Sequence, residues 1–195
     1  MKIILASNSN TRKKILDSLN IKYDVIVSDK EEIANDSDPR KYVEELSKVK
    51  AKSVSEKIDR SDVIIIAADS IIYKDGKIYQ KPKSIEEAME NLREFSNCKN
   101  QGITGVTIID MSNRRNVTFS CVTDVYFKRI CEEDIKWYVK HEKDLLKKAG
   151  YSLEGTISLF VEKIEGDFYN VLGLPLGMLY TKLNELGYRL DDFEC

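Results

Sequence analysis

Apolar and polar residues follow one another in short blocks, and the blocks predict an alternation of strands and helices. KIILA (2–6) is an apolar run that ends in the polar SNSN, and the apolar positions of the next ten residues have helical spacing. This predicts a strand, a loop and a helix. YDVIV (23–27) indicates a second strand. Pro39 suits the first turn of a helix over 39–58, where apolar residues recur every three to five positions.

The middle of the chain predicts a buried strand and a hairpin. VIIIAAD (63–69) is apolar until its aspartate, as expected of a central strand with both faces covered. SIIYKDGKIYQK (70–81) predicts a hairpin, because KDGK separates two β-rich segments. Ser84 and Glu87 form a capping-box pattern that opens a helix over 84–95.

The rest of the chain continues the alternation. It predicts strands at 103–110 and 117–127, a helix at 132–143, a loop at 147–155, a strand at 159–164 and a helix from Pro175 to about 186. We therefore predict an α/β fold with a mixed central sheet flanked by helices. No linker or repeat divides the chain, so residues 1–195 are expected to form one domain.

Composition narrows the function classes. Hydrophobic residues make up 42% and charged residues 33%, and 31 basic against 33 acidic side chains leave a net charge of −2. Nucleic acid is thus a poor default partner, whereas a small anion needs only a local cationic cluster. The four cysteines and His141 show no zinc-binding spacing. The N-terminal apolar run is too short for a signal peptide or a membrane span, so we expect a cytoplasmic protein without a membrane partner.

The first candidate site is the SNSN loop. Ser7 and Ser9 follow the first strand and precede the helix that carries Arg12. Hydroxyls, backbone N–H groups and a helix N-terminus together suit phosphate oxygens. The alternative is an ordinary helix cap, for which serine and asparagine are favoured on structural grounds.

The second candidate site is acidic. Asp69 ends the apolar run at 63–68, and a carboxylate there must be solvated, paired or bound to a metal. Glu31 follows the second predicted strand. If their oxygens converge, they suit Mg²⁺ or Mn²⁺ better than zinc. The alternatives are a capping or ion-paired aspartate and a solvated loop glutamate.

Two lysines stand at informative positions. Lys50 lies on the stripe that its helix should turn inward, so it either reaches the edge of the core or points at an anion. Lys81 follows the hairpin and precedes Pro82, which favours an extended backbone; it could equally be a plain surface residue.

Several segments resemble, in order, the motifs of the Maf family of nucleotide pyrophosphatases: ASNSNTRKKIL (6–16), VSDKEE (27–32), YVEELSKVKA (42–51), AADSIIYKDGKIYQKP (67–82), KKAGYSLEG (147–155) and FVEKIEGDFYNVLGLPLG (160–177). The similarity spans nearly the whole chain. It implies two lobes around a cleft, a homodimer, and hydrolysis of the α–β phosphoanhydride of a nucleoside triphosphate with a divalent cation.

The resemblance also implies roles for residues. Ser7, Ser9 and Arg12 would hold phosphates, which Lys50 and Lys81 would neutralise. Glu31 and Asp69 would hold the metal, and Asp69 would also place or deprotonate the attacking water. Positioning, cations and a Lewis acid are what phosphoryl transfer needs.

Two departures from the family pattern bear on the base. Thr11 replaces an arginine, and Glu154 replaces a glutamine. A carboxylate only accepts hydrogen bonds, so Glu154 suits a donor-rich edge such as guanine, and we expect a guanine-type substrate such as 7-methyl-GTP. The alternatives are that Glu154 pairs with a lysine and that the substrate is dTTP or UTP.

Two other functions are compatible with the sequence. An inosine or xanthosine triphosphate pyrophosphatase would share the reaction and a similar N-terminal motif. Outside enzymes, a nucleotide-binding protein related to cell division would use the same phosphate contacts without turnover.

Overall fold

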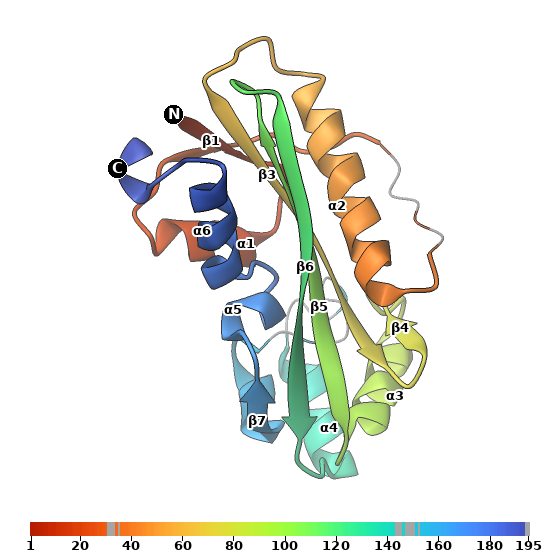
Figure 1. The fold of residues 1–195 in the computed structure, drawn as a ribbon. Helices are drawn as coiled ribbons and strands as arrows, with labels where there is room; N and C mark the ends of the chain where they lie inside the picture. The colour runs from red at the N-terminus through yellow and green to blue at the C-terminus, as the bar shows by residue number, and fades with distance from the viewer. Residues whose placement is uncertain (31–33, 35, 143–145, 147–150, 152, 194–195) are drawn as a thin grey trace.

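The computed structural model describes residues 1–30, 34, 36–142, 146, 151 and 153–193 (Figure 1). Its elements, in chain order, are β1 (Lys2–Leu5), α1 (Asn10–Asp17), β2 (Tyr23–Val25), α2 (Pro39–Ser55), β3 (Val63–Lys74), β4 (Lys77–Tyr79), α3 (Ile85–Phe95), β5 (Lys99–Asp110), β6 (Arg115–Phe127), α4 (Glu132–His141), the 3-10 helix η2 (Thr156–Phe160), β7 (Val161–Glu165), α5 (Phe168–Val171), α6 (Leu176–Glu185) and the 3-10 helix η3 (Leu190–Asp192). Within the described residues, no helix is both long and apolar enough to cross a bilayer.

Most predicted elements are confirmed, with corrections at their ends. β5 begins at Lys99, four residues before the predicted start. The strand predicted over 159–164 begins only at Val161, because residues 156–160 form η2. The short helix α5 was not predicted. The helix predicted over 132–143 ends earlier, at His141, and most of the loop predicted over 147–155 lies outside the described residues.

All strands belong to one mixed sheet, which confirms the predicted fold class. The order is β2-β1-β3-β5-β6-β7, and β4 pairs with β3. β1 runs parallel to both β2 and β3, whereas the pairings of β3 with β4 and β5, of β5 with β6, and of β6 with β7 are antiparallel. The predicted hairpin turns at Asp75 and Gly76, both with positive φ, as this two-residue turn requires.

β3 corrects one expectation. The strand does not end at Asp69 but continues to Lys74, so the aspartate lies in its middle. What ends nearby is the strand beside it. β1 pairs with β3 only as far as Ile66, and β4 takes over at Ile72. Along this edge of β3, the described chain places no strand between Ile66 and Ile72, which leaves a gap in the sheet beside Asp69.

The two faces of the sheet are covered by different helices (Figure 1). Successive side chains of a strand point to opposite faces. On one face, Ile65 and Ala67 of β3 pack with residues of α2, and on the other, Ile64 and Ile66 pack with α1 and α6. α2 lies so close to β5 that a Cβ on Gly105 would sit 2.4 Å from the carbonyl group of Val43.

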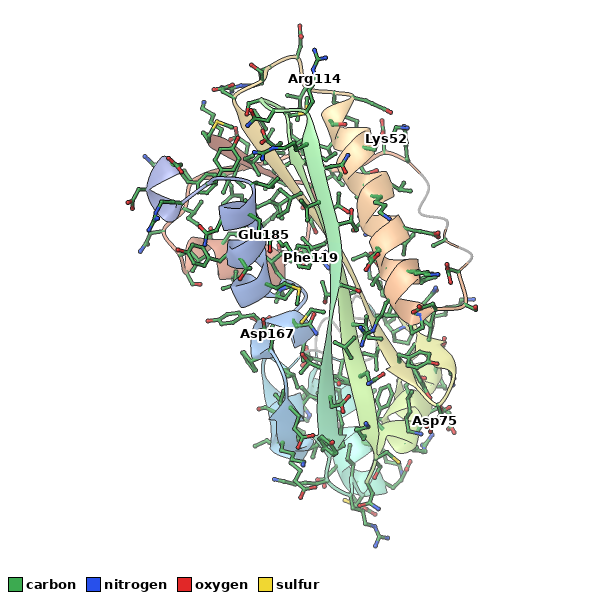
Figure 2. All side chains as sticks on the ribbon, viewed as in Figure 1. Lys52, Asp75, Arg114, Phe119, Asp167 and Glu185 are labelled. Carbon is green, nitrogen blue, oxygen red and sulfur yellow. The ribbon has the colours of Figure 1, made fainter. Side chains whose placement is uncertain are left out.

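The face opposite α2 carries two apolar clusters. One joins α1 and α6 to the first half of β3, and the other joins α3 and α4 to Ile72 and the last residues of β6. Phe119, near the middle of β6, belongs to the first cluster (Figure 2). The clusters are the cores of two lobes, and polar side chains of β3 and β5 lie between them.

Candidate active site

An open cleft of about 1300 Å³ lies where β1 gives way to β4 along β3. The β1–α1 loop, α2, the middle of β3, the residues after β4 and the segment 170–173 line it. Every described residue that the sequence marked as a site candidate lines this cleft: Ser7, Ser9, Arg12, Lys50, Asp69, Lys81 and Glu154. The fold therefore brings together segments that are far apart in the chain.

An ion pair occupies the α2 face of the cleft. Lys50 of α2 is buried, and its Nζ lies 2.5 Å from Oδ1 of Asp69. The Asp69 side chain is 15% exposed. Of the two roles considered for Lys50, the structure supports the one in which it points at an anion, here the carboxylate of Asp69. In the described part of the chain, this is the one partner of that carboxylate.

A buried arginine occupies the opposite face and donates hydrogen bonds to three neutral groups of the described chain. Arg12 donates from Nε to the carbonyl of Gly173 (2.7 Å), from Nη1 to the hydroxyl of Ser7 (3.0 Å) and from Nη2 to that of Ser70 (2.9 Å). Gly173 has a φ of +103°, and a Cβ there would come within 3.4 Å of Nη2. Asp69 and Ser70 are consecutive in β3, so strand alternation directs one to Lys50 and the other to Arg12.

The loop before α1 has the local structure of a helix cap. Ser9 is the N-cap residue, and its hydroxyl accepts a hydrogen bond from the backbone N–H of Arg12. The Ser7 hydroxyl accepts from the backbone N–H of Ser9. The capping role of Ser9 is thereby confirmed, and phosphate binding by Ser7 and Ser9 stays a prediction.

The metal site is only partly described. Glu31 lies outside the described residues, but the chain just before it is held against α2. Asp29 accepts from the Ser53 hydroxyl and pairs with Lys57, and these contacts lower the pKa of the Asp29 carboxyl. The described residues contain no cluster of three or more metal-binding side chains. Mg²⁺ needs no such cluster, since one or two carboxylates and the substrate phosphates can hold it, and Asp69 offers such an oxygen.

Glu154 already has partners from α1. It accepts a hydrogen bond from Oγ1 of Thr11 (3.1 Å) and lies 3.7 Å from Nζ of Lys14. The two positions that depart from the family pattern thus contact each other. The lysine pairing weighed as an alternative for Glu154 is present. Nearby, burial raises the pKa of Tyr151, which lines the cleft as a neutral phenol.

Sequence reasoning gave no role to Ser70, Thr104, Asn170 or Gly173. All four line the cleft, and Ser70 and Gly173 contact Arg12. The segment NVLGLPLG contains Asn170 and Gly173, and AADSIIYKDGKIYQKP contains Ser70; the resemblance included both segments without assigning roles to these three residues. Thr104 had no signal, because a threonine within a strand is ordinary.

The cleft, with a carboxylate and two buried cationic side chains beside the gap between β1 and β4 of a mixed sheet, defines an α/β protein built for a small phosphorylated ligand. Comparison with known proteins gives the family. The chain belongs to the Maf family: the model of the family, described as Maf-like protein, matches residues 2–186.

Relatives cover the chain almost from end to end. The dTTP/UTP pyrophosphatase of Alkaliphilus metalliredigens is 45% identical over 96% of this chain and 95% of its own length. The dTTP/UTP pyrophosphatase of Thermosipho melanesiensis is 41% identical over 94% and 97%. Among solved structures, the Staphylococcus aureus Ham1 protein matches 65% of this chain and 72% of its own with 18% identity and a TM-score of 0.48.

Proposed function

We propose that this protein is a nucleoside triphosphate pyrophosphatase that hydrolyses dTTP and UTP to the monophosphate and pyrophosphate. The observation that carries the proposal is the joint position of Asp69, Lys50 and Arg12 in one cleft, in a chain 45% identical to a dTTP/UTP pyrophosphatase over nearly its whole length. A charged triphosphate needs cations around it, and its hydrolysis needs an acceptor for a proton of water.

Asp69 is the proposed base. Lys50 donates to its Oδ1, and in the described part of the chain Oδ2 makes no hydrogen bond or ion pair. Oδ2 would accept a proton as the water oxygen forms its bond to the α-phosphorus. The bond between that phosphorus and the bridging oxygen breaks, and its electron pair leaves with pyrophosphate. Lys50 fixes the carboxylate and adds positive charge beside the phosphates.

The remaining polar groups would hold the triphosphate. Arg12 presents its terminal N–H groups to the cleft from a fixed position, and Lys81, which is exposed, would approach from the opposite lobe. Ser7 and Ser9 lie at the N-terminus of α1, where the helix dipole favours anions. A divalent cation held by Asp69 and Glu31 would supply Lewis-acid stabilisation when bound.

For the nucleobase of the substrate, the contacts of Glu154 and the names of the relatives favour the pyrimidine alternative. Thr11 and Lys14 engage the Glu154 carboxylate, so the sequence-based reason for guanine loses its support. The 7-methyl-GTP preference and the homodimer implied by the family resemblance remain untested predictions. We adopt dTTP and UTP because both relatives described above carry that name.

A substrate panel tests the proposal. Purified protein with Mg²⁺ or Mn²⁺ is given dTTP, UTP, GTP, 7-methyl-GTP, ITP and XTP, and released pyrophosphate and orthophosphate are measured separately. We expect pyrophosphate, with kcat/KM at least about tenfold higher for dTTP and UTP than for the purines. Faster cleavage of a purine nucleotide would contradict the proposed preference for dTTP and UTP. Release of orthophosphate would contradict the proposed cleavage of the α–β phosphoanhydride bond. No product from any nucleotide would favour a binding protein.

A further inference from the structure

A chain of hydrogen bonds leads away from Arg12 through the half-buried hydroxyl of Ser70 and the buried hydroxyl of Thr104. Nη2 of Arg12 lies 2.9 Å from the hydroxyl of Ser70, which lies 2.9 Å from Oγ1 of Thr104. Oγ1 of Thr104 in turn lies 2.9 Å from the backbone carbonyl oxygen of Asn170. Thr104 is 0% exposed and Asn170 is 1% exposed, so the contact between these two residues is shielded from water.

The direction of every hydrogen bond in this chain follows from its two ends. A guanidinium only donates and a carbonyl only accepts, whereas each hydroxyl carries one proton. Thr104 must therefore donate to Asn170, which leaves it to accept the proton of Ser70. Ser70 is then oriented to accept from Arg12. Each bond polarises the next, so the Ser70 oxygen is a better acceptor than an isolated hydroxyl.

A second set of hydrogen bonds, on the other side of the guanidinium, closes this series of contacts into a ring. The backbone N–H of Gly173 donates to the same carbonyl of Asn170 (2.9 Å), and the carbonyl of Gly173 accepts from Nε of Arg12. Nε and Nη2 are thus held by two routes that meet at one backbone oxygen. The guanidinium is restrained in its plane, which a single contact would not achieve.

The side chain of Asn170 anchors that backbone oxygen. Its Nδ2 donates to the carbonyl of Gly102 (2.9 Å) and to Oγ1 of Thr123 (3.0 Å), which ties the segment to β5 and β6. Its Oδ1 is buried without a hydrogen-bond partner among the described residues. A buried acceptor without a partner is costly, and the two hydrogen bonds of Nδ2 offset that cost.

We infer that Thr104 and Asn170 are positioning residues of the proposed reaction: through Ser70 and Gly173 they fix the guanidinium of Arg12 toward the phosphates. The inference rests on the proposed function and goes beyond it, because neither residue needs to touch substrate. Positive charge placed before the substrate arrives stabilises the transition state without reorganisation, and a guanidinium free to rotate would lose that benefit.

The test exchanges hydroxyl for methyl at two buried threonines of β5. Thr104→Val removes the link between Ser70 and Asn170, and Thr104→Ser keeps it. The matched control is Thr107→Val, because Thr107 is also a buried threonine of β5 but its hydroxyl contacts Ser47 (2.7 Å) and Thr118 (3.0 Å), away from Arg12. Urea denaturation shows whether the two valine variants lose similar stability.

We expect Thr104→Val to lower kcat/KM about tenfold, while Thr104→Ser and Thr107→Val stay within about threefold of wild type. In an Arg12→Lys background, Thr104→Val should cost less than about twofold, because the group it positions is gone. Equal losses in Thr104→Val and Thr107→Val would overturn the inference, as would an undiminished effect in the Arg12→Lys background.

A binding measurement separates this inference from the proposed function. Titration calorimetry with inorganic tripolyphosphate reads the phosphate site without turnover. We expect Thr104→Val to bind about tenfold more weakly than Thr107→Val. If the wild type cleaves no nucleotide but this difference holds, the proposed function fails and the positioning role stands. Equal affinities, or no binding to wild type, overturn the positioning role.

Discussion

Two aspartates on neighbouring strands show how differently one fold can treat a carboxylate. Asp110, at the end of β5, is 0% exposed and accepts hydrogen bonds from the backbone and side chains of Ser112 and Asn113. Burial alone would raise the pKa of Asp110, but these hydrogen bonds outweigh it and hold that pKa well below its usual range. Asp69, in the middle of β3, has Lys50 as its one partner in the described part of the chain.

The difference separates structure from chemistry. Asp110 uses its oxygens to close the β5–β6 turn and, through Arg115, faces the C-terminal segment at Leu186. A carboxylate so fully occupied has no capacity for a ligand. Asp69 keeps an oxygen toward the cleft and has an ammonium, which can move, as its partner. We therefore expect substitution of Asp69 to affect turnover and substitution of Asp110 to affect stability.

The largest effect is expected from Asp69→Asn. The change keeps the shape of the side chain but removes the proposed base and the charge proposed to hold the metal, so kcat should fall by roughly 10³-fold or more. Pyrophosphate release from dTTP measures it. Asp75→Asn is the control, because Asp75 lies in the exposed β3–β4 turn, where Asn before Gly is favoured (Figure 2). Activity of Asp69→Asn within tenfold of the control would rule out the proposed base.

The reverse behaviour is expected of Asp110→Asn. An amide places an NH₂ group against donors that now point at an oxygen, so the free energy of unfolding should fall by about 2–4 kcal/mol. Urea denaturation at neutral pH measures the loss, and kcat per folded molecule should not change. A loss below about 0.5 kcal/mol would mean that the hydrogen-bonded carboxylate contributes nothing specific.

The pH dependence of this stabilisation has a definite sign. Because the folded-state pKa of Asp110 lies below the unfolded value of about 3.9, the unfolded chain binds the extra proton between those two values. The stabilisation is complete above the unfolded value and is lost as the pH falls toward the folded one. The difference in unfolding free energy between wild type and Asp110→Asn should thus be constant from neutral pH down to about 5 and shrink below about 4.

The two carboxylates also show what the sequence could predict. Periodicity located the strand that carries Asp69 and marked Lys50 as an inward-facing charge, and the family resemblance grouped them in one site. The sequence could not show that the cleft opens beside the middle of β3. The position of the cleft depends on where β1 and β4 end rather than on residues 63–74. Asp110 drew no comment, because its significance lies in donors that a turn brings around it.

The ring of hydrogen bonds around Arg12, on the other face of β3, was likewise not predictable from the sequence. Ser70, Thr104 and Asn170 are ordinary residues for strands and turns, and their spacing along the chain carries no periodic signal. Their alignment arises only when register places Ser70 beside Thr104 in the antiparallel pair and the segment after β7 returns to the sheet. Patterns predict elements well, whereas a hydrogen-bond ring among several elements requires their packing.

A smaller effect than the loss of Asp69 is expected from Lys50→Met. The side chain keeps its length and fills the same buried space, but the cation beside Asp69 disappears, so kcat/KM should fall about a hundredfold. Lys52→Met is the control, since Lys52 is an exposed lysine of the same helix (Figure 2). Steady-state kinetics with dTTP measures both. If the two variants are equally active, Lys50 only stabilises the fold and the α2 face is not part of the site.

The smallest effect is expected from Glu154→Gln. With Thr11 and Lys14 as its partners, and with its pairing to an exposed lysine contributing little, Glu154 should not select the base. The ratio of kcat/KM for dTTP to that for GTP should change by less than about threefold. Glu185→Gln, in an exposed pair with Lys182, is the control (Figure 2). If Glu154 instead reads a guanine edge, the amide places an NH₂ against base donors, and purine turnover should fall more than about tenfold. That result would return the substrate to the guanine class and make Glu154 the residue that defines nucleobase specificity, while the two faces of β3 would keep their proposed role at the phosphates.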